Sequence, residues 1–179
     1  MRRILLLVLA LGVGLVLGGA ALATGNDKDK DKSKGGGSSS ARLDGYQETP
    51  SISTAGRGDF SAKVEGTTIT FRLRYDGLEG GAVAQAHLHF GQQHVSGGVS
   101  AFLCGGGGKP ACPASGTVEG TIVPADVVGP AGQGIAAGQF DELVRAIRAG
   151  AVYANVHTAT YSAGEIRGQL KGRGKSISG

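Results

Sequence analysis

Three histidines fall on two short segments whose residue pattern is typical of β-strands. His87 and His89 are two residues apart, so a strand would direct both imidazoles to one face, together with Gln85. His157 would share a face with Asn155, while the alternate positions around it are apolar. Neutral imidazoles are good ligands for zinc or copper. If the two segments lie side by side, the sequence predicts a metal site formed by His87, His89 and His157.

The same residues permit a second interpretation, in which the imidazoles belong to a buried hydrogen-bond network with Asn155, Glu165 or backbone carbonyls. Glu165 and Arg167 are also two apart and would share one face of the last strand. Such a carboxylate and guanidinium could form a paired ion network with the histidines. His94 lies in a predicted loop flanked by glycines, where it could join the cluster or stay exposed.

None of the polar residues forms a recognisable catalytic set. Glu165 has no second carboxylate placed to complete a general acid/base pair. Ser96 and Ser100 lie near His94 but lack a G-x-S-x-G elbow, and the glycine run at 105–109 lacks the Lys-Ser/Thr ending of a phosphate loop. The chain has no Trp and few other aromatics, which disfavours a stacking platform for sugars or bases. We therefore assign no catalytic residue and favour a protein that is not an enzyme.

Two cysteines, Cys104 and Cys112, bound a short loop rich in glycine and containing proline. In an oxidising compartment such a pair should form a disulfide that closes this loop. A zinc site is the alternative, but the spacing is not C-x-x-C and there is no second cysteine pair.

The amino-terminal region has the pattern of an export signal. Arg2 and Arg3 precede an apolar run, which ends in the small residues around Ala21 and Ala23. This order predicts a signal peptide over 1–23, cleaved after Ala23; the alternative is an uncleaved membrane anchor. Residues 24–40 alternate Asp with Lys before a Gly and Ser tract, which predicts a disordered polar linker. We expect one domain over 41–172 and a flexible tail over 173–179.

The net charge of the chain does not indicate a nucleic-acid partner. The whole chain has a formal net charge of +4. Loss of Arg2 and Arg3 with the signal peptide would leave about +2, too near neutral for phosphate-backbone recognition. After cleavage no further membrane span is expected.

Glycine recurs between short runs of β-branched and alternating residues, which is typical of an antiparallel sandwich or barrel. One segment has helical spacing instead, with Phe140, Leu143, Val144 and Ile147 in register and Gly150 at its end. We predict a mainly β fold, an antiparallel Greek-key-like β-sandwich or barrel with one short helix at 139–149 and a loop at 124–138. The predicted strands are 43–48, 57–64, 67–75, 82–90, 99–103, 117–123, 151–157 and 164–171.

Several motifs in this order resemble the CHRD (chordin-type) domain family. They are Leu43-Asp44-Gly45 with Glu48-Thr49-Pro50, the H-x-H of His87 and His89 followed by Gly91, Asn155-Val156-His157-Thr158, and the run from Gly164 to Leu170. The resemblance covers nearly all of 43–170. It implies an extracellular β-rich domain and does not imply a reaction. The cysteine-bounded insertion between Phe102 and Thr117 departs from the family pattern, as does the lack of the cysteine-rich modules that bind growth factors in chordin.

The resulting expectation is an exported, non-catalytic binding or structural module, with zinc or copper as the candidate metals and an unidentified extracellular or cell-envelope component as its partner. One alternative is a copper/zinc redox enzyme, because H-x-H followed by glycine also looks like the metal-binding strand of copper/zinc superoxide dismutases. Those enzymes use further histidines and an Asp ligand that this chain does not supply. A second alternative is a cell-envelope adhesion module, for which the linker would supply reach.

Overall fold

The computed structural model of the 179-residue chain describes residues 37–172. The predicted signal peptide, all but the last residues of the predicted linker, and the predicted tail lie outside the described residues. The described part is mainly β, with one α-helix and three short 3-10 helices. In chain order the elements are β1 Ser38–Asp44, η1 Gly45–Gln47, β2 Arg57–Glu65, β3 Thr68–Asp76, β4 Val83–Phe90, β5 Gly98–Cys104, β6 Gly116–Ile122, η2 Pro124–Asp126, η3 Ala131–Gln133, α1 Phe140–Arg148, β7 Val152–Thr158, β8 Ile166–Gln169 and β9 Lys171–Gly172.

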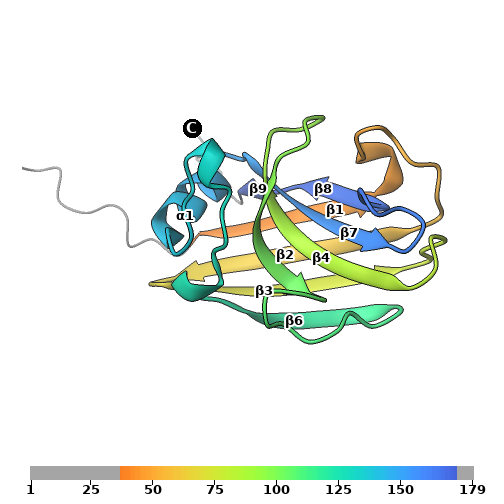
Figure 1. Ribbon diagram of the computed structural model, residues 1–179, viewed down its shortest axis with the longest axis horizontal. Helices are drawn as coiled ribbons and strands as arrows, with labels where there is room; N and C mark the ends of the chain where they lie inside the picture. Colours follow the sequence, from red (N-terminus) through yellow and green to blue (C-terminus); the bar gives the residue numbers. More distant parts are fainter. Residues whose placement is uncertain (1–36, 173–179) are drawn as a thin grey trace, which may run out of the picture. The chain divides into compact units, whose positions relative to one another are not determined.

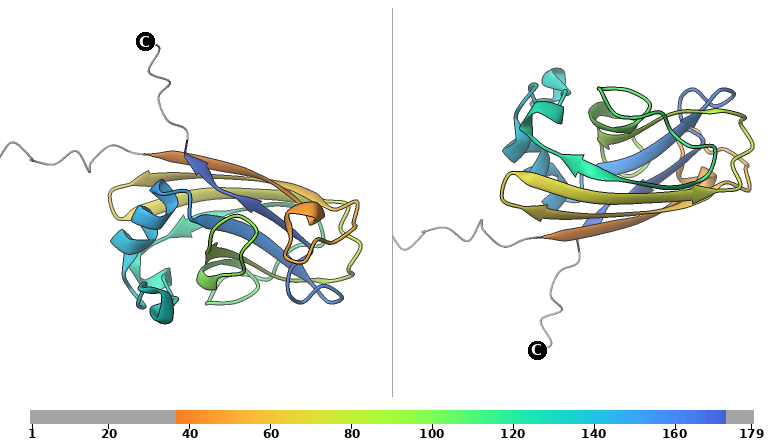
Figure 2. Two further views of the ribbon diagram at one scale, coloured as in Figure 1. Left: turned by 90° about the horizontal axis from the view of Figure 1, so that it is seen from above. Right: turned by 90° about the horizontal axis from the view of Figure 1, so that it is seen from below.

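The strands form one antiparallel sheet in the order β5-β4-β7-β8-β1-β2-β3-β6, with β9 paired to β1. The sheet curls over so that β4 and β7 lie across the core from β2 and β3, and the result is close to a barrel (Figures 1 and 2). The β3–β4 connection crosses from near one end of this strand order to near the other, and the β5–β6 connection crosses back, as in Greek-key folds. The predicted fold class is confirmed.

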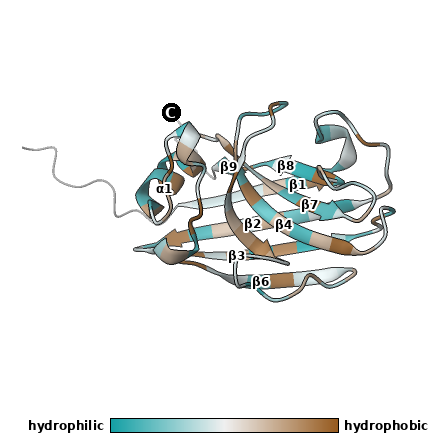
Figure 3. Cartoon of the chain, in the orientation of Figure 1, coloured by the Kyte–Doolittle hydropathy of each residue, from teal (hydrophilic) through white to brown (hydrophobic). Residues whose placement is uncertain are grey.

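Strict alternation along the strands builds the core between the two halves of the sheet. In β3, Ile69, Phe71, Leu73 and Tyr75 are buried while the residues between them face solvent. The matching bands of hydropathy along the strands are visible in Figure 3. Two-residue periodicity therefore places the apolar side of each strand inward, and it fixes which side chains face the other way.

The first strand differs from the predicted one. β1 begins at Ser38 and ends at Asp44, and the carboxylate of Asp44 then accepts a hydrogen bond of 3.1 Å from the Gln47 N–H to cap η1. Ser39 pairs with Ala62 of β2. Backbone pairing with β2 and β9 needs no apolar side chain, so serines assigned to the linker by their composition belong to the sheet.

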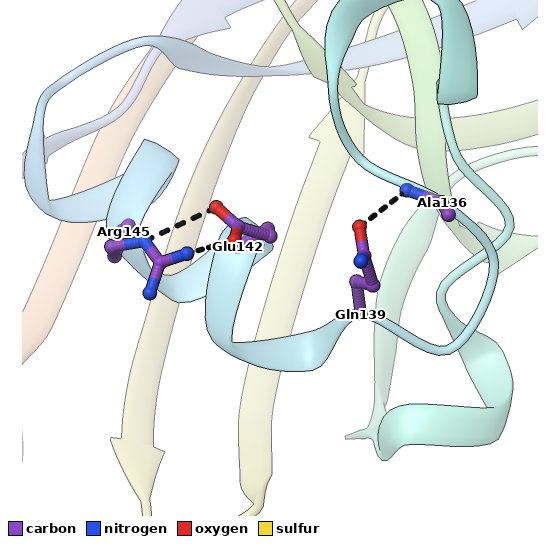
Figure 4. A network of polar contacts seen from close by, with 4 residues as sticks. All are labelled: Ala136, Gln139, Glu142 and Arg145. Atoms are coloured by element: carbon purple, nitrogen blue, oxygen red, sulfur yellow. Dashed lines mark hydrogen bonds and ion pairs between the residues drawn. The ribbon is translucent and has the colours of Figure 1, made fainter.

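Helix α1 lies at one end of the sheet and buries Phe140, Leu143 and Ile147 against it (Figure 1). It ends as predicted, because Gly150 has a φ of 70° and its N–H bonds to the Ile147 carbonyl, while the Ala151 N–H reaches Ala146. The start of the helix is held by polar contacts, shown in Figure 4: the Gln139 side chain accepts from the Ala136 N–H, and Glu142 pairs with Arg145 one turn on.

The cysteines form the predicted disulfide, with an S–S distance of 1.98 Å between Cys104 at the end of β5 and Cys112. Within residues 37–172, no helix has the length and apolar character needed to cross a membrane.

Removing this disulfide with paired Cys104→Ala and Cys112→Ala substitutions should lower the free energy of unfolding by about 2 to 3 kcal/mol. The reason is that a nine-residue loop regains its freedom in the unfolded chain. Urea denaturation of the variant and the parent measures the difference. Equal midpoints and slopes would show that the loop's own hydrogen bonds, such as Gly105 N–H to Pro110 O at 2.7 Å, already supply the constraint.

Candidate metal centre

Antiparallel pairing of β4 with β7 brings the three histidines together. His87 lies opposite Asn155, Gln85 opposite His157, and His89 opposite Tyr153. These residues all face away from the core, because the residues between them in both strands are core residues. The two strands run side by side in Figure 1. The predicted neighbourhood of His87, His89 and His157 is therefore present in the structure.

The three imidazoles form one compact, buried cluster. One nitrogen from each ring lies within 4.8 Å of the other two, and Nδ1 of His87 is 3.1 Å from Nε2 of His157. Ligands bound to zinc at about 2.0 Å would be about 3.3 to 3.5 Å apart, so a small contraction suffices to enclose an ion. The exposed fractions are only 4 % for His87 and 8 % for each of the others. His94 does not join: it is exposed in the 91–97 loop.

The outward-facing nitrogen of each ring has a fixed carbonyl partner. His89 Nδ1 lies 3.0 Å from the Gly97 carbonyl, and His157 Nδ1 lies 3.0 Å from the Ser162 carbonyl. A carbonyl can only accept, so both Nδ1 atoms carry the hydrogen. Metal-binding histidines are usually oriented in this way by a hydrogen bond from their second nitrogen.

Gln85 orients the third ring, that of His87. Its amide nitrogen donates to the Gly105 carbonyl at 3.3 Å, which leaves its oxygen facing His87 Nε2 at 3.1 Å. His87 therefore donates from Nε2 and carries a lone pair on Nδ1. This assignment depends on the Gly105 carbonyl, which directly follows the disulfide cysteine of β5.

These assignments direct three lone pairs at one point. His89 Nε2 is buried without any hydrogen-bond partner. The facing nitrogens of His87 and His157 would each present a lone pair across 3.1 Å, which is repulsive unless a proton or a cation lies between them. A metal ion bound between the three rings would satisfy all three nitrogens together.

Burial keeps the rings neutral, the protonation state that binds metals. It lowers the pKa of His87 to about 3, with the nearby His157 and His89 acting in the same direction. Burial also lowers the pKa of His89 to about 4, against the opposing hydrogen bond to Gly97. The pKa of His157 falls for the same reason, and its bond to Ser162 opposes the shift.

Arg167 is linked to the cluster by a stack on the aromatic ring of Tyr153. Its guanidinium carbon lies 3.6 Å from the centroid of the Tyr153 ring, and that ring stacks on His89 with centroids 4.8 Å apart and planes 6° from parallel. The guanidinium also donates to the carbonyls of Gln92 and Val95, which ties the 91–97 loop down beside the site.

Asn155, which lies opposite His87 in the pairing of β4 with β7, contacts a carboxyl that sequence reasoning missed. Its amide donates to Glu48 at 3.1 Å, and both residues are buried. Burial raises the pKa of Glu48 to about 7, while the positive charge of Arg167 and the Asn155 bond oppose this rise. Glu48 reaches the site from the irregular segment after η1, where no side-chain periodicity could indicate its direction. The Glu-Thr-Pro motif there was the only available signal.

The predicted ion network of Glu165 with Arg167 and the histidines is wrong in its pairing. The Glu165 carboxylate accepts from the Thr54 and Thr158 hydroxyls and from the Glu79 and Gly80 N–H groups, at 2.6 to 3.0 Å. Among the charged side chains of residues 37–172, none forms an ion pair with it. Glu165 precedes β8, so strand alternation no longer governs where its side chain points. Asn155 and Arg167 do lie beside the histidines.

Comparison with known proteins identifies the family. The model of the CHRD domain matches residues 39–170, which include every residue of the cluster. Neither a curated protein nor a solved structure gives a significant match to the chain. Since the family model covers most of the chain, the protein belongs to the CHRD domain family.

Proposed function

We propose that this protein is an exported, non-catalytic extracytoplasmic module that binds a transition metal, zinc or copper, through His87, His89 and His157. The observation that carries the proposal is the convergence of three neutral imidazole lone pairs, each ring held in position by a second hydrogen bond.

The surroundings of the cluster favour binding over turnover. Each histidine of the cluster is at most 8 % exposed, which leaves a substrate little access to a bound ion. The candidate ligand group contains three histidines and, among the described residues, no Asp, Glu or Cys. This differs from the larger donor set of the copper/zinc superoxide dismutases, so the proposal does not include their reaction.

Export is supported by separate features. The Cys104–Cys112 disulfide is typical of an oxidising compartment, and the N-terminal sequence has the order of a signal peptide. The family is named after an extracellular protein. An extracytoplasmic module would meet metal ions or envelope components directly.

Protein secreted with its own signal and purified without an affinity tag should contain close to one equivalent of zinc or copper. His89→Ala should lose most of it, because two imidazoles rarely suffice to retain these ions against a chelator. Elemental analysis after dialysis against a weak chelator, with and without added metal, measures the content.

The matched control is His94→Asn. His94 is exposed and has a φ of 63°, a conformation that asparagine tolerates, so this variant removes one imidazole without touching the cluster. Metal content equal to the parent is expected. Uptake that is absent in the parent, or equal in the parent and His89→Ala, would refute the metal site.

A further inference from the structure

We infer that the histidine cluster selects Cu(I) over Zn(II), so that the module binds or carries reduced copper. This inference rests on the proposed function and specifies its ligand. Three structural features support it: the number of ligands, their charge, and the charged group that stands nearest to them.

The ligand number suits Cu(I). Three imidazole nitrogens converge, and no further His, Cys, Asp or Glu of residues 37–172 joins the group. Zinc in structural sites is almost always held by four protein ligands, and in three-ligand sites it keeps water in an open fourth position. Cu(I) is stable with three nitrogen donors in a plane. All three rings are buried, which limits the access of the water that zinc would require.

The ligand charge also favours a monovalent ion. The three donors are neutral, so any ion brings its full charge into a buried site. The idealised cost of moving an ion from water into such a medium grows with the square of its charge, and is therefore about four times larger for Zn(II) than for Cu(I). Thiolate or carboxylate ligands normally offset this cost for zinc, and this cluster has neither.

The nearest charged group makes the preference stronger. Arg167 is the charged side chain that acts on the His89 ring, and both groups stack on the ring of Tyr153. Glu48, a carboxyl on which the charge of Arg167 acts, is hydrogen-bonded to Asn155 and can at most balance the guanidinium. The surroundings of the cluster are thus neutral or positive, which penalises a dication more than a monocation.

Competition titrations of the full chain test the selectivity. Copper(I) is added under anaerobic conditions in the presence of bathocuproine disulfonate, and zinc(II) is added in the presence of a colorimetric zinc chelator. We expect one equivalent of Cu(I) to be withheld from its chelator, and a tenfold excess of Zn(II) not to displace it. Zinc binding that equals or exceeds copper binding would overturn the inference and leave the metal site standing. Failure to bind either ion would refute both.

Two substitutions of Arg167 separate charge from structure. Arg167→Gln removes the positive charge, and Arg167→Lys keeps it while losing the planar stack on Tyr153. Because the guanidinium lies at most about 8 Å from the centre of the His89 ring, removing its charge should raise zinc affinity relative to Cu(I) affinity by about tenfold. The lysine variant should keep the parental ratio. Equal ratios in all three proteins would show that Arg167 has no part in the selectivity.

Discussion

Substitution of Glu165 by alanine should destabilise the domain by about 3 to 5 kcal/mol, the largest effect expected of any single side chain outside the apolar core. The carboxylate is fully buried and accepts four hydrogen bonds, two from hydroxyls and two from backbone N–H groups. Alanine would leave four donors without their acceptor, and two of these donors, on Gly80 and Thr158, are buried. Burial raises the pKa of this carboxyl, but the four hydrogen bonds outweigh it and hold the pKa below its usual value.

Chemical denaturation at pH 7 measures the loss. Glu165→Gln keeps the shape and one acceptor oxygen, so it should cost less than alanine. Glu119→Ala is the matched control, because Glu119 is exposed and paired with Arg72 at 3.1 Å on the outer sheet surface. Its removal should change stability by less than about 1 kcal/mol. A loss with Glu165→Ala no larger than with Glu119→Ala would mean that solvent replaces the carboxylate at no cost.

The role of Glu165 shows where prediction from sequence ends. Two-residue alternation correctly placed His87 with His89, and His157 with Asn155, because these residues lie inside regular strands. The same alternation predicts that Glu165 shares one face of the last strand with Arg167, and the structure differs. It lies one residue before β8, next to Gly164, which has a φ of 131°. Its carboxylate contacts Thr158, and the side chain of Thr158 lies on the opposite side of β7 from His157.

The ring orientations depend on partners that no local pattern specifies. Gly97 and Ser162 contribute backbone carbonyls, which every residue has, so sequence alone cannot single them out. Gln85 was placed on the correct face, but its role requires Gly105 to fix its amide from a neighbouring strand. The strand pairing decides these contacts. The clustering of the three histidines was therefore predictable from the sequence, and the hydrogen bonds that orient their rings were not.

Acidification should destabilise the metal-free domain steeply below pH 6.5. In the unfolded chain each imidazole takes up its proton near pH 6.5, whereas folded His87 and His89 do so only near pH 3 and 4. The unfolded state binds more protons throughout this window, so the free energy of unfolding falls by about 1.4 kcal/mol per pH unit for each ring. Glu48 acts in the opposite direction. Its folded pKa of about 7 lies above its unfolded value of 4.5, so its protonation offsets about one ring over that range.

The net loss between pH 6.5 and 4.5 should be at least about 2 kcal/mol, and His157 adds to the effect. Denaturation in the presence of a chelator, at half-unit pH steps, gives the slope. His89→Phe keeps an aromatic ring against Tyr153 and removes one titrating group, so its slope should be smaller by about 1.4 kcal/mol per pH unit. His94→Asn should keep the parental slope, and identical slopes for all three proteins would contradict buried neutral imidazoles.

Because the buried imidazoles stay neutral, metal binding should offset the loss of folding stability at low pH. At pH 5 folded His87 and His89 still present their lone pairs, and the lowered pKa of His157 acts in the same direction, whereas ordinary histidines are largely protonated. An ion that binds only the folded state stabilises it in proportion to the logarithm of its concentration over its dissociation constant. One equivalent of Cu(I) added anaerobically at pH 5 should therefore restore stability to the parent and not to His89→Phe. Equal recovery in both proteins would place the copper somewhere other than this cluster.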